Sequence, residues 1–84
     1  MPIEITRPTE IKAGDLYEDS FYHPCLCIEV NGYEVWGISL IDGSYPRSED
    51  IAPGSIRKLS LEEAWLWKTK GPVDVVLDDE FRWW

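Results

Sequence analysis

Residues 21–41 read FYHPCLCIEVNGYEVWGISLI, two runs of strand-forming residues separated by the Asn-Gly pair at 31–32. Asn-Gly between two such runs is the strongest short-range signal for a β-hairpin, because both residues tolerate the positive φ angles of a tight turn. We therefore expect a hairpin over about 21–41, and the rest of the chain can be placed around it.

The register of this hairpin follows from charge. A two-residue loop would place Glu29 opposite Glu34, a repulsive pair, so we expect the four-residue loop that places Val30 opposite Val35. In this register both faces are apolar: Leu26, Ile28 and Val30 lie with Val35, Gly37 and Ile41, and the other face holds Cys25, Cys27, Trp36, Ile38 and Leu40. A strand pair that is apolar on both faces must be covered on both, as in a small barrel with an element packed outside it.

The segment SLEEAWLWKTKGP, residues 60–72, predicts the covering helix. Ser60 and Glu63 have the spacing of a capping box, and a Gly-Pro pair follows two lysines at the other end. We expect a helix over about 61–70 that packs on the sheet through one apolar stripe, made of Leu61, Ala64 and Trp65.

The remaining segments give weaker signals. Residues 3–5 alternate as a first strand, and the segment 42–59 predicts a long loop or a few short strands. Alternation over 73–77 predicts a final strand that continues into an aromatic tail and ends at residue 84. If the alternation persists, Phe81 and Trp83 point inward and Trp84 points outward.

These elements indicate one domain over 1–84 of the α+β class, mainly β. We expect an SH3-like or otherwise rolled antiparallel sheet or barrel, with one helix from the C-terminal half packed on it. The resemblance to SH3-like barrels is one of pattern, and it rests on several short strands and a Gly-Asp turn at 14–15.

Composition excludes several classes of partner. The 84 residues include 16 acidic and eight basic ones, a net charge of −8. A nucleic-acid backbone or an anionic membrane surface requires a basic footprint, so neither is expected as a ligand. The start of the chain lacks the pattern of a secretory leader, no run is long enough to span a membrane, and two cysteines are too few for a disulfide framework, so we expect a cytoplasmic protein.

Chemistry-bearing residues are sparse. His23, Cys25 and Cys27 point the same way on a strand, but a zinc site needs four ligands, so we expect buried, reduced, metal-free cysteines. The acidic pairs, among them Glu18–Asp19, indicate a solvated face. We expect no catalytic residue, no cofactor and no metal, and hence no enzyme.

The sequence therefore favours a small non-catalytic protein-interaction module or adaptor, which binds a protein partner or a second copy of itself. Its candidate interaction surface combines aromatic residues with arginines: Trp84, Arg82, Tyr45 and Arg47. The alternative for the loop is that Tyr45, Ile51 and Ile56 plug the barrel mouth while Arg47 pairs with an acid. The alternative function is an acidic inhibitor or nucleic-acid mimic that blocks a basic site, and a third is an enzyme with a carboxylate site.

Overall fold

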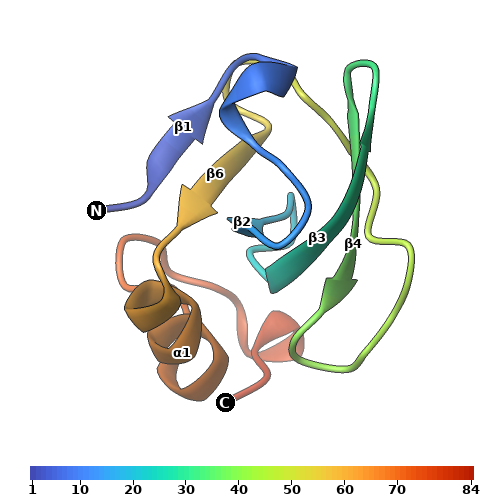
Figure 1. Cartoon of the computed structure of the whole chain (residues 1–84). Coiled ribbons are helices and arrows are strands. Elements are labelled where there is room, and N and C mark those ends of the chain that lie inside the picture. Colours follow the sequence, from blue (N-terminus) through green and yellow to red (C-terminus); the bar gives the residue numbers. More distant parts are fainter.

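The computed structural model describes all 84 residues, which form six strands, one α-helix and two single-turn 3₁₀ helices (Figure 1). In chain order the elements are β1 (Ile3–Ile5), η1 (Pro8–Glu10), β2 (Leu16–Glu18), β3 (Pro24–Asn31), β4 (Glu34–Ser39), β5 (Glu49–Asp50), β6 (Ile56–Leu59), α1 (Leu61–Lys70) and η2 (Asp79–Phe81). The molecule is a small, mainly β member of the α+β class.

The six strands form one antiparallel sheet in the order β1-β6-β2-β3-β4-β5. The sheet curls, so that β1 and β6 lie across from the β3–β4 hairpin in Figure 1. β1 and β5 remain edges, and the sheet is therefore not closed into a barrel. The expected antiparallel sheet with one helix packed on it is confirmed at this level.

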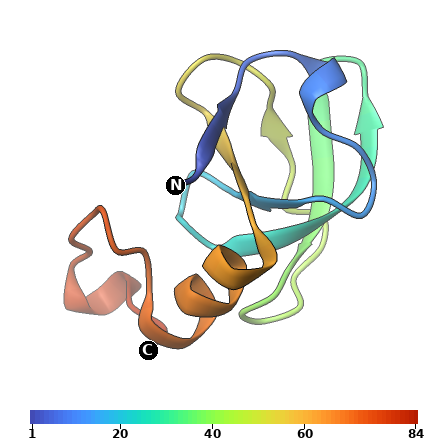
Figure 2. The same ribbon diagram turned by 60° about the vertical axis from the view of Figure 1, so that its left-hand side comes forward.

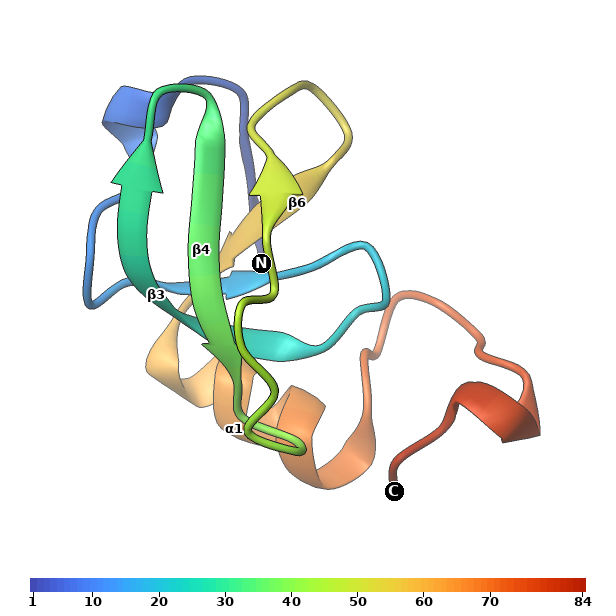
Figure 3. The same ribbon diagram turned by 90° about the vertical axis from the view of Figure 1, so that its right-hand side faces the viewer.

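The hairpin has the predicted register. Val30 lies opposite Val35, and the turn itself is Gly32-Tyr33, with a positive φ of 61° at Gly32. That backbone region is open to glycine without the steric cost that a side chain brings. The loop is shorter than the four residues predicted, because Asn31 ends β3 and pairs with Glu34. β3 and β4 are the two longest strands of the sheet, and they stand side by side in Figure 3.

The predicted faces of this hairpin are wrong for the cysteines. The register shifts between Cys27 and Glu29, which marks a β-bulge, and Cys25 lies opposite Ser39 while Cys27 lies opposite Gly37. A bulge inserts one extra residue in one strand and so reverses which side chains share a face beyond it. Both cysteines are buried free thiols, as expected, but they pack inside the curled sheet rather than beside Trp36.

The inner core depends on a close approach between Tyr17 and Gly37. A Cβ atom built on Gly37 would lie 2.6 Å from the carbonyl oxygen of Leu26 and 2.7 Å from the Tyr17 ring, too close for a real side chain. The Tyr17 hydroxyl then reaches across and donates to the Arg47 carbonyl oxygen at 2.7 Å. The fully buried ring thereby connects β2, β4 and the segment that precedes β5.

α1 begins and ends where the sequence predicts. The Glu63 amide donates to the Ser60 hydroxyl and the Ser60 amide to the Glu63 carboxylate, while Gly71, at φ 80°, closes the last turn. The predicted packing stripe is right for Ala64, which is buried, and wrong for Leu61 and Trp65. Trp65 is 65% exposed and Leu61 is exposed as well, whereas Trp67 is 1% exposed and packs with Ala64, Leu59 and Leu16 on the outer face of the sheet.

The segment 42–59 contains two short strands, one of the two predicted alternatives. β5 adds to the free side of β4, and β6 returns to pair with both β1 and β2. Ile51 and Ile56 are buried in the inner core as expected, but Tyr45 is exposed. The long connection and β5 run beside β4 in Figure 3.

The predicted final strand does not form. Residues 73–77 make no backbone hydrogen bond to the sheet, and the chain instead extends past α1 before η2 (Figure 2). The single turn of η2 changes the phase of the tail. Phe81 is therefore exposed, contrary to prediction, while Trp83 packs inward and its indole N–H donates to the Trp67 carbonyl oxygen at 2.9 Å.

Candidate functional site

The turn between β2 and β3, residues 19–23, is the most strained part of the backbone. Tyr22 has a φ of 66°, and it is the only residue other than glycine with a positive φ. This conformation costs an L-residue on the order of 1–2 kcal/mol, and such strain tends to be kept at functional sites. Asp19 compensates for it, because its Oδ1 accepts from the amides of Phe21 and His23 at 2.9 Å each.

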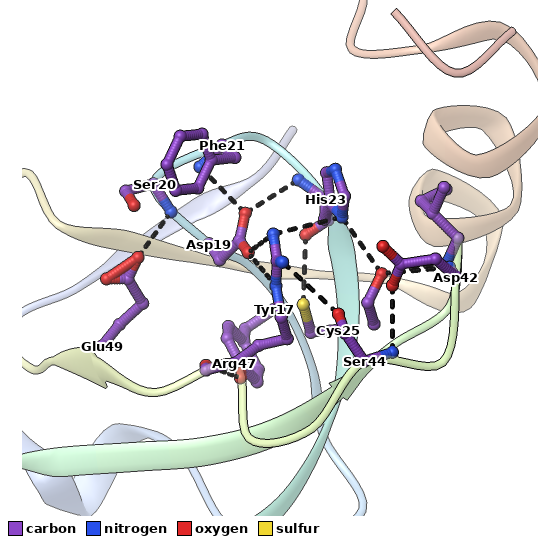
Figure 4. A network of polar contacts seen from close by, with 12 residues as sticks. Tyr17, Asp19, Ser20, Phe21, His23, Cys25, Asp42, Ser44, Arg47 and Glu49 are labelled. Carbon is purple, nitrogen blue, oxygen red and sulfur yellow. Dashed lines mark hydrogen bonds and ion pairs between the residues drawn. The ribbon is translucent and has the colours of Figure 1, made fainter. Parts of the chain in front are cut away.

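The other oxygen of Asp19 binds an arginine from the opposite side of the sheet. Asp19 Oδ2 accepts from Arg47 Nε at 2.9 Å and lies 2.7 Å from Arg47 Nη2 (Figure 4). The carboxylate is almost fully buried, and a buried charge is tolerated only with such partners. The pair ties the strained turn to the segment that leads into β5.

His23 sits next to this pair and is held in one tautomer. Its Nδ1 lies 3.2 Å from Arg47 Nη2 and 3.1 Å from the Ser39 hydroxyl. Figure 4 shows the His23 ring beside Arg47 and Asp19. A guanidinium group only donates, so Nδ1 accepts and the proton of the neutral ring is on Nε2. Burial lowers the pKa of His23, and the charge of Arg47 lowers it further. The carboxylates of Asp19 and Asp42 act in the opposite direction and raise this pKa, but the net shift is downward.

A second buried carboxylate lies on the other side of β2. Glu18 accepts from both Arg57 Nε at 2.9 Å and Arg57 Nη2 at 2.8 Å, and from the Trp67 indole at 2.6 Å. Asp74 binds the remaining edge of the same guanidinium, and this hydrogen bonding lowers the pKa of Asp74. Arg57 thereby joins the sheet, the helix and the segment after the helix.

These elements surround a cleft of about 740 Å³ on the open side of the curled sheet. Twelve residues line it, of which six are acidic, one is basic and two are hydrophobic. The lining is contributed by β1, β2 and the strained turn, β5, the turn before β6, β6 itself and the segment after α1: Glu4, Glu18, Asp19, Ser20, Tyr22, Glu49, Asp50, Gly54, Ser55, Arg57, Asp74 and Val75.

Three carboxylates of the cleft have no cation partner. Glu4 accepts from the Gly54 amide and Glu49 from the Ser20 amide, and Asp50 is exposed on the edge strand. None of the three takes part in an ion pair. Since the only basic residue of the lining, Arg57, is already shared between two acids, the cleft presents a net negative field.

The sequence analysis did not predict this site, because adjacent acidic residues indicate a solvated face. Glu18 and Asp19 are each only 4% exposed, contrary to that expectation. Their arginines lie 28 and 39 positions further along the chain, so no local pattern shows the pairing. The one available signal was the place of both acids at the end of a strand that begins with apolar residues.

The structure does not bring the four residues predicted as an interaction surface together in one place. Arg82 lies over the Trp84 ring at 4.8 Å, and the Trp84 ring covers Gly71, so these two stay together near the end of α1. Arg47 belongs to the Asp19 network, in agreement with the alternative that it pairs with an acid. Tyr45 is exposed and makes no hydrogen bond or ring contact with the other three.

The remaining candidates for chemistry are metal-ligating clusters and the two cysteines. No group of three or more His, Cys, Asp or Glu side chains has the geometry of a metal site. Burial raises the pKa of Cys25, whose thiol donates to the His23 carbonyl oxygen, and burial likewise raises the pKa of Cys27. A nucleophilic cysteine needs the opposite shift.

α1, at ten residues, is the longest helix and is too short to cross a bilayer. No protein-family model matches the chain, and comparison with curated proteins and with solved structures finds none that is similar. The fold and the cleft are therefore the basis for assigning a class of function.

Proposed function

We propose that this protein is a small, cytoplasmic, non-catalytic interaction module whose cleft binds a basic segment of a partner protein. The observation that carries the proposal is the cleft of about 740 Å³ in which six carboxylates face one arginine. Lysine and arginine side chains are the complement to such a field, and charge complementarity contributes both specificity and rapid association.

The lining argues for a peptide rather than a small apolar ligand. Pockets for small molecules are mostly apolar with a few polar groups, whereas only two of the twelve lining residues here are hydrophobic.

Two further features support this assignment. Tyr22 lines the cleft in a strained conformation that Asp19 maintains, as expected where a side chain is displayed for recognition. The strand order β6-β2-β3-β4-β5 within the curled sheet is also consistent with an SH3-like roll, to which β1 adds a sixth strand. The two edge strands of the sheet, β1 and β5, both contribute residues to the cleft.

The same groups argue against an enzyme with a carboxylate site. A general acid needs a raised pKa, but the Arg57 guanidinium lowers the pKa of Asp74. Asp19 and Glu18 each accept hydrogen bonds from fixed partners within the fold, where they stabilise the structure.

The net charge of −8 supports one other candidate, an acidic inhibitor or nucleic-acid mimic that covers a basic site on a larger protein. In that case binding uses acids over the whole surface, and the cleft has no special role. The two functions therefore differ in where neutralising substitutions act.

The test is binding of an oligolysine peptide, measured by calorimetry at low salt. Glu49→Gln with Asp50→Asn removes two charges from the cleft and keeps the Glu49 acceptor for the Ser20 amide. Glu29→Gln with Glu80→Gln is the matched control, because it removes the same charge from exposed residues outside the cleft.

We expect the cleft variant to bind roughly tenfold more weakly, about 1.4 kcal/mol, and the control to bind nearly like the parent. Equal weakening in both variants would instead assign the binding to diffuse surface charge, as in the mimic. Absence of measurable oligolysine binding to the parent protein would rule out both.

A further inference from the structure

A second cavity of about 220 Å³ lies on the other side of the 19–23 turn. It is lined by Phe21, His23, Arg47 and Phe81, and it contains no acidic residue. From Ser20 to His23 the side chains alternate between the two sites, since Ser20 and Tyr22 line the acidic cleft while Phe21 and His23 line this cavity. The turn is therefore a shared wall between an acidic and an aromatic concavity.

The walls of this cavity are two phenylalanine rings from distant parts of the chain. Phe21 is 62% exposed and Phe81 is 54% exposed, so neither ring is needed to fill the core. Phe81 is carried by η2 and is kept near the turn by Trp83, whose ring packs edge-on against His23 at 4.8 Å. Two exposed phenylalanines that line one cavity are suited to contact a third apolar group.

The other two lining residues are Arg47, which is positively charged, and His23, which can donate a hydrogen bond. The Arg47 guanidinium, 5.8 Å from the centre of the Phe21 ring, is fixed by Asp19 and by the Ser44 hydroxyl. His23, with Nδ1 accepting, carries its N–H on Nε2. A cation next to ring walls favours an aromatic group over an aliphatic one, because the face of an aromatic ring is electronegative.

We propose that this cavity binds one aromatic side chain of the partner, so that the recognised segment combines basic residues with an aromatic residue. The cavity is smaller than the range of about 300–1,000 Å³ for small-molecule pockets, as expected for a single side chain. This inference rests on the proposed function for the basic part of the segment. The aromatic site itself has its own test.

That test uses single side chains as probes. N-acetyl-tyrosinamide and N-acetyl-phenylalaninamide, titrated into the protein, are expected to shift the NMR signals of Phe21, His23 and the Arg47 Nε–H in a saturable manner. N-acetyl-leucinamide is the aliphatic comparison and should shift them much less. Phe81→Ala should abolish the saturable shifts, whereas Trp65→Ala, which removes an exposed ring elsewhere, should leave them unchanged.

Equal shifts from the leucine and the aromatic probes, or unchanged shifts in Phe81→Ala, would overturn the aromatic site.

The link to the cleft is tested with oligolysine peptides that carry one tyrosine at successive positions. At one position or more, affinity should rise about tenfold over oligolysine alone, and Phe81→Ala should remove this gain while leaving oligolysine binding intact. No gain at any position would overturn the link, and loss of oligolysine binding alone would overturn the cleft and leave the aromatic site standing.

Discussion

His23 shows how much one residue depends on its surroundings. It is the only histidine, and two donors, Arg47 Nη2 and the Ser39 hydroxyl, face its Nδ1. Burial lowers its pKa, Arg47 adds to this, and Asp19 and Asp42 oppose it. Because the folded pKa lies below the unfolded value of about 6.5, the unfolded chain binds the proton first, and stability falls as pH decreases from about 6.5 to the folded pKa.

We therefore predict that the free energy of unfolding, measured in urea, decreases between about pH 7.5 and 5.5. His23→Gln is the control, and its stability should vary less over this interval. The protein contains no other histidine, so the difference between the two slopes reports His23 alone. Identical slopes would show that His23 titrates freely.

At the scale of elements, α1 is attached through Trp67. This side chain is buried between the helix and the sheet, and its indole donates to Glu18, while Trp65 on the same helix points away. We predict that Trp67→Ala lowers the free energy of unfolding by about 3–5 kcal/mol, as for other large core truncations. The measurement is equilibrium unfolding followed by far-UV circular dichroism.

Trp65→Ala is the matched control on the same helix. An exposed substitution of this kind changes stability by about 0.5 kcal/mol or less. If Trp65→Ala were instead the more damaging of the two, the helix would be docked by its other face. Such a result would contradict the packing described above.

At the scale of the whole molecule, the acidic cleft works against the stability of the unbound protein. Three of its carboxylates have no cation partner, and the chain as a whole has a net charge of −8. Screening of this repulsion by salt should therefore raise Tm, as the Debye length falls from about 30 Å at 0.01 M to about 3 Å at 1 M.

The Glu49→Gln, Asp50→Asn variant should be more stable than the parent at low salt, and its Tm should rise less when salt is added. This would be the usual exchange of stability for function at a binding site. A Tm that decreases with salt would mean that the ion pairs of Arg47 and Arg57 outweigh the repulsion.

Local signals predicted the elements whose causes are local. The hairpin register follows from the repulsion that would arise if Glu29 lay opposite Glu34. The helix bounds follow from Ser60, Glu63 and Gly71. Alternation failed to predict which side chains are buried where one extra residue or one turn shifts the alternation of inward and outward side chains. The bulge after Cys27 and the turn at η2 each shifted side chains to another face, and alternation in the sequence cannot show either.

The sequence by itself determined an acidic, mainly antiparallel sheet with one capped helix, because turn residues, caps and alternation act within a few positions. Only the tertiary structure decided which tryptophan is buried, because the direction in which the sheet meets α1 selects Trp67 over Trp65, two positions away on the same helix. It also decided the site. Glu18 and Asp19 become cleft residues only when Arg57 from β6 and Arg47 from the segment before β5 pair with them, and such long-range charge pairing has no signature in the order of residues.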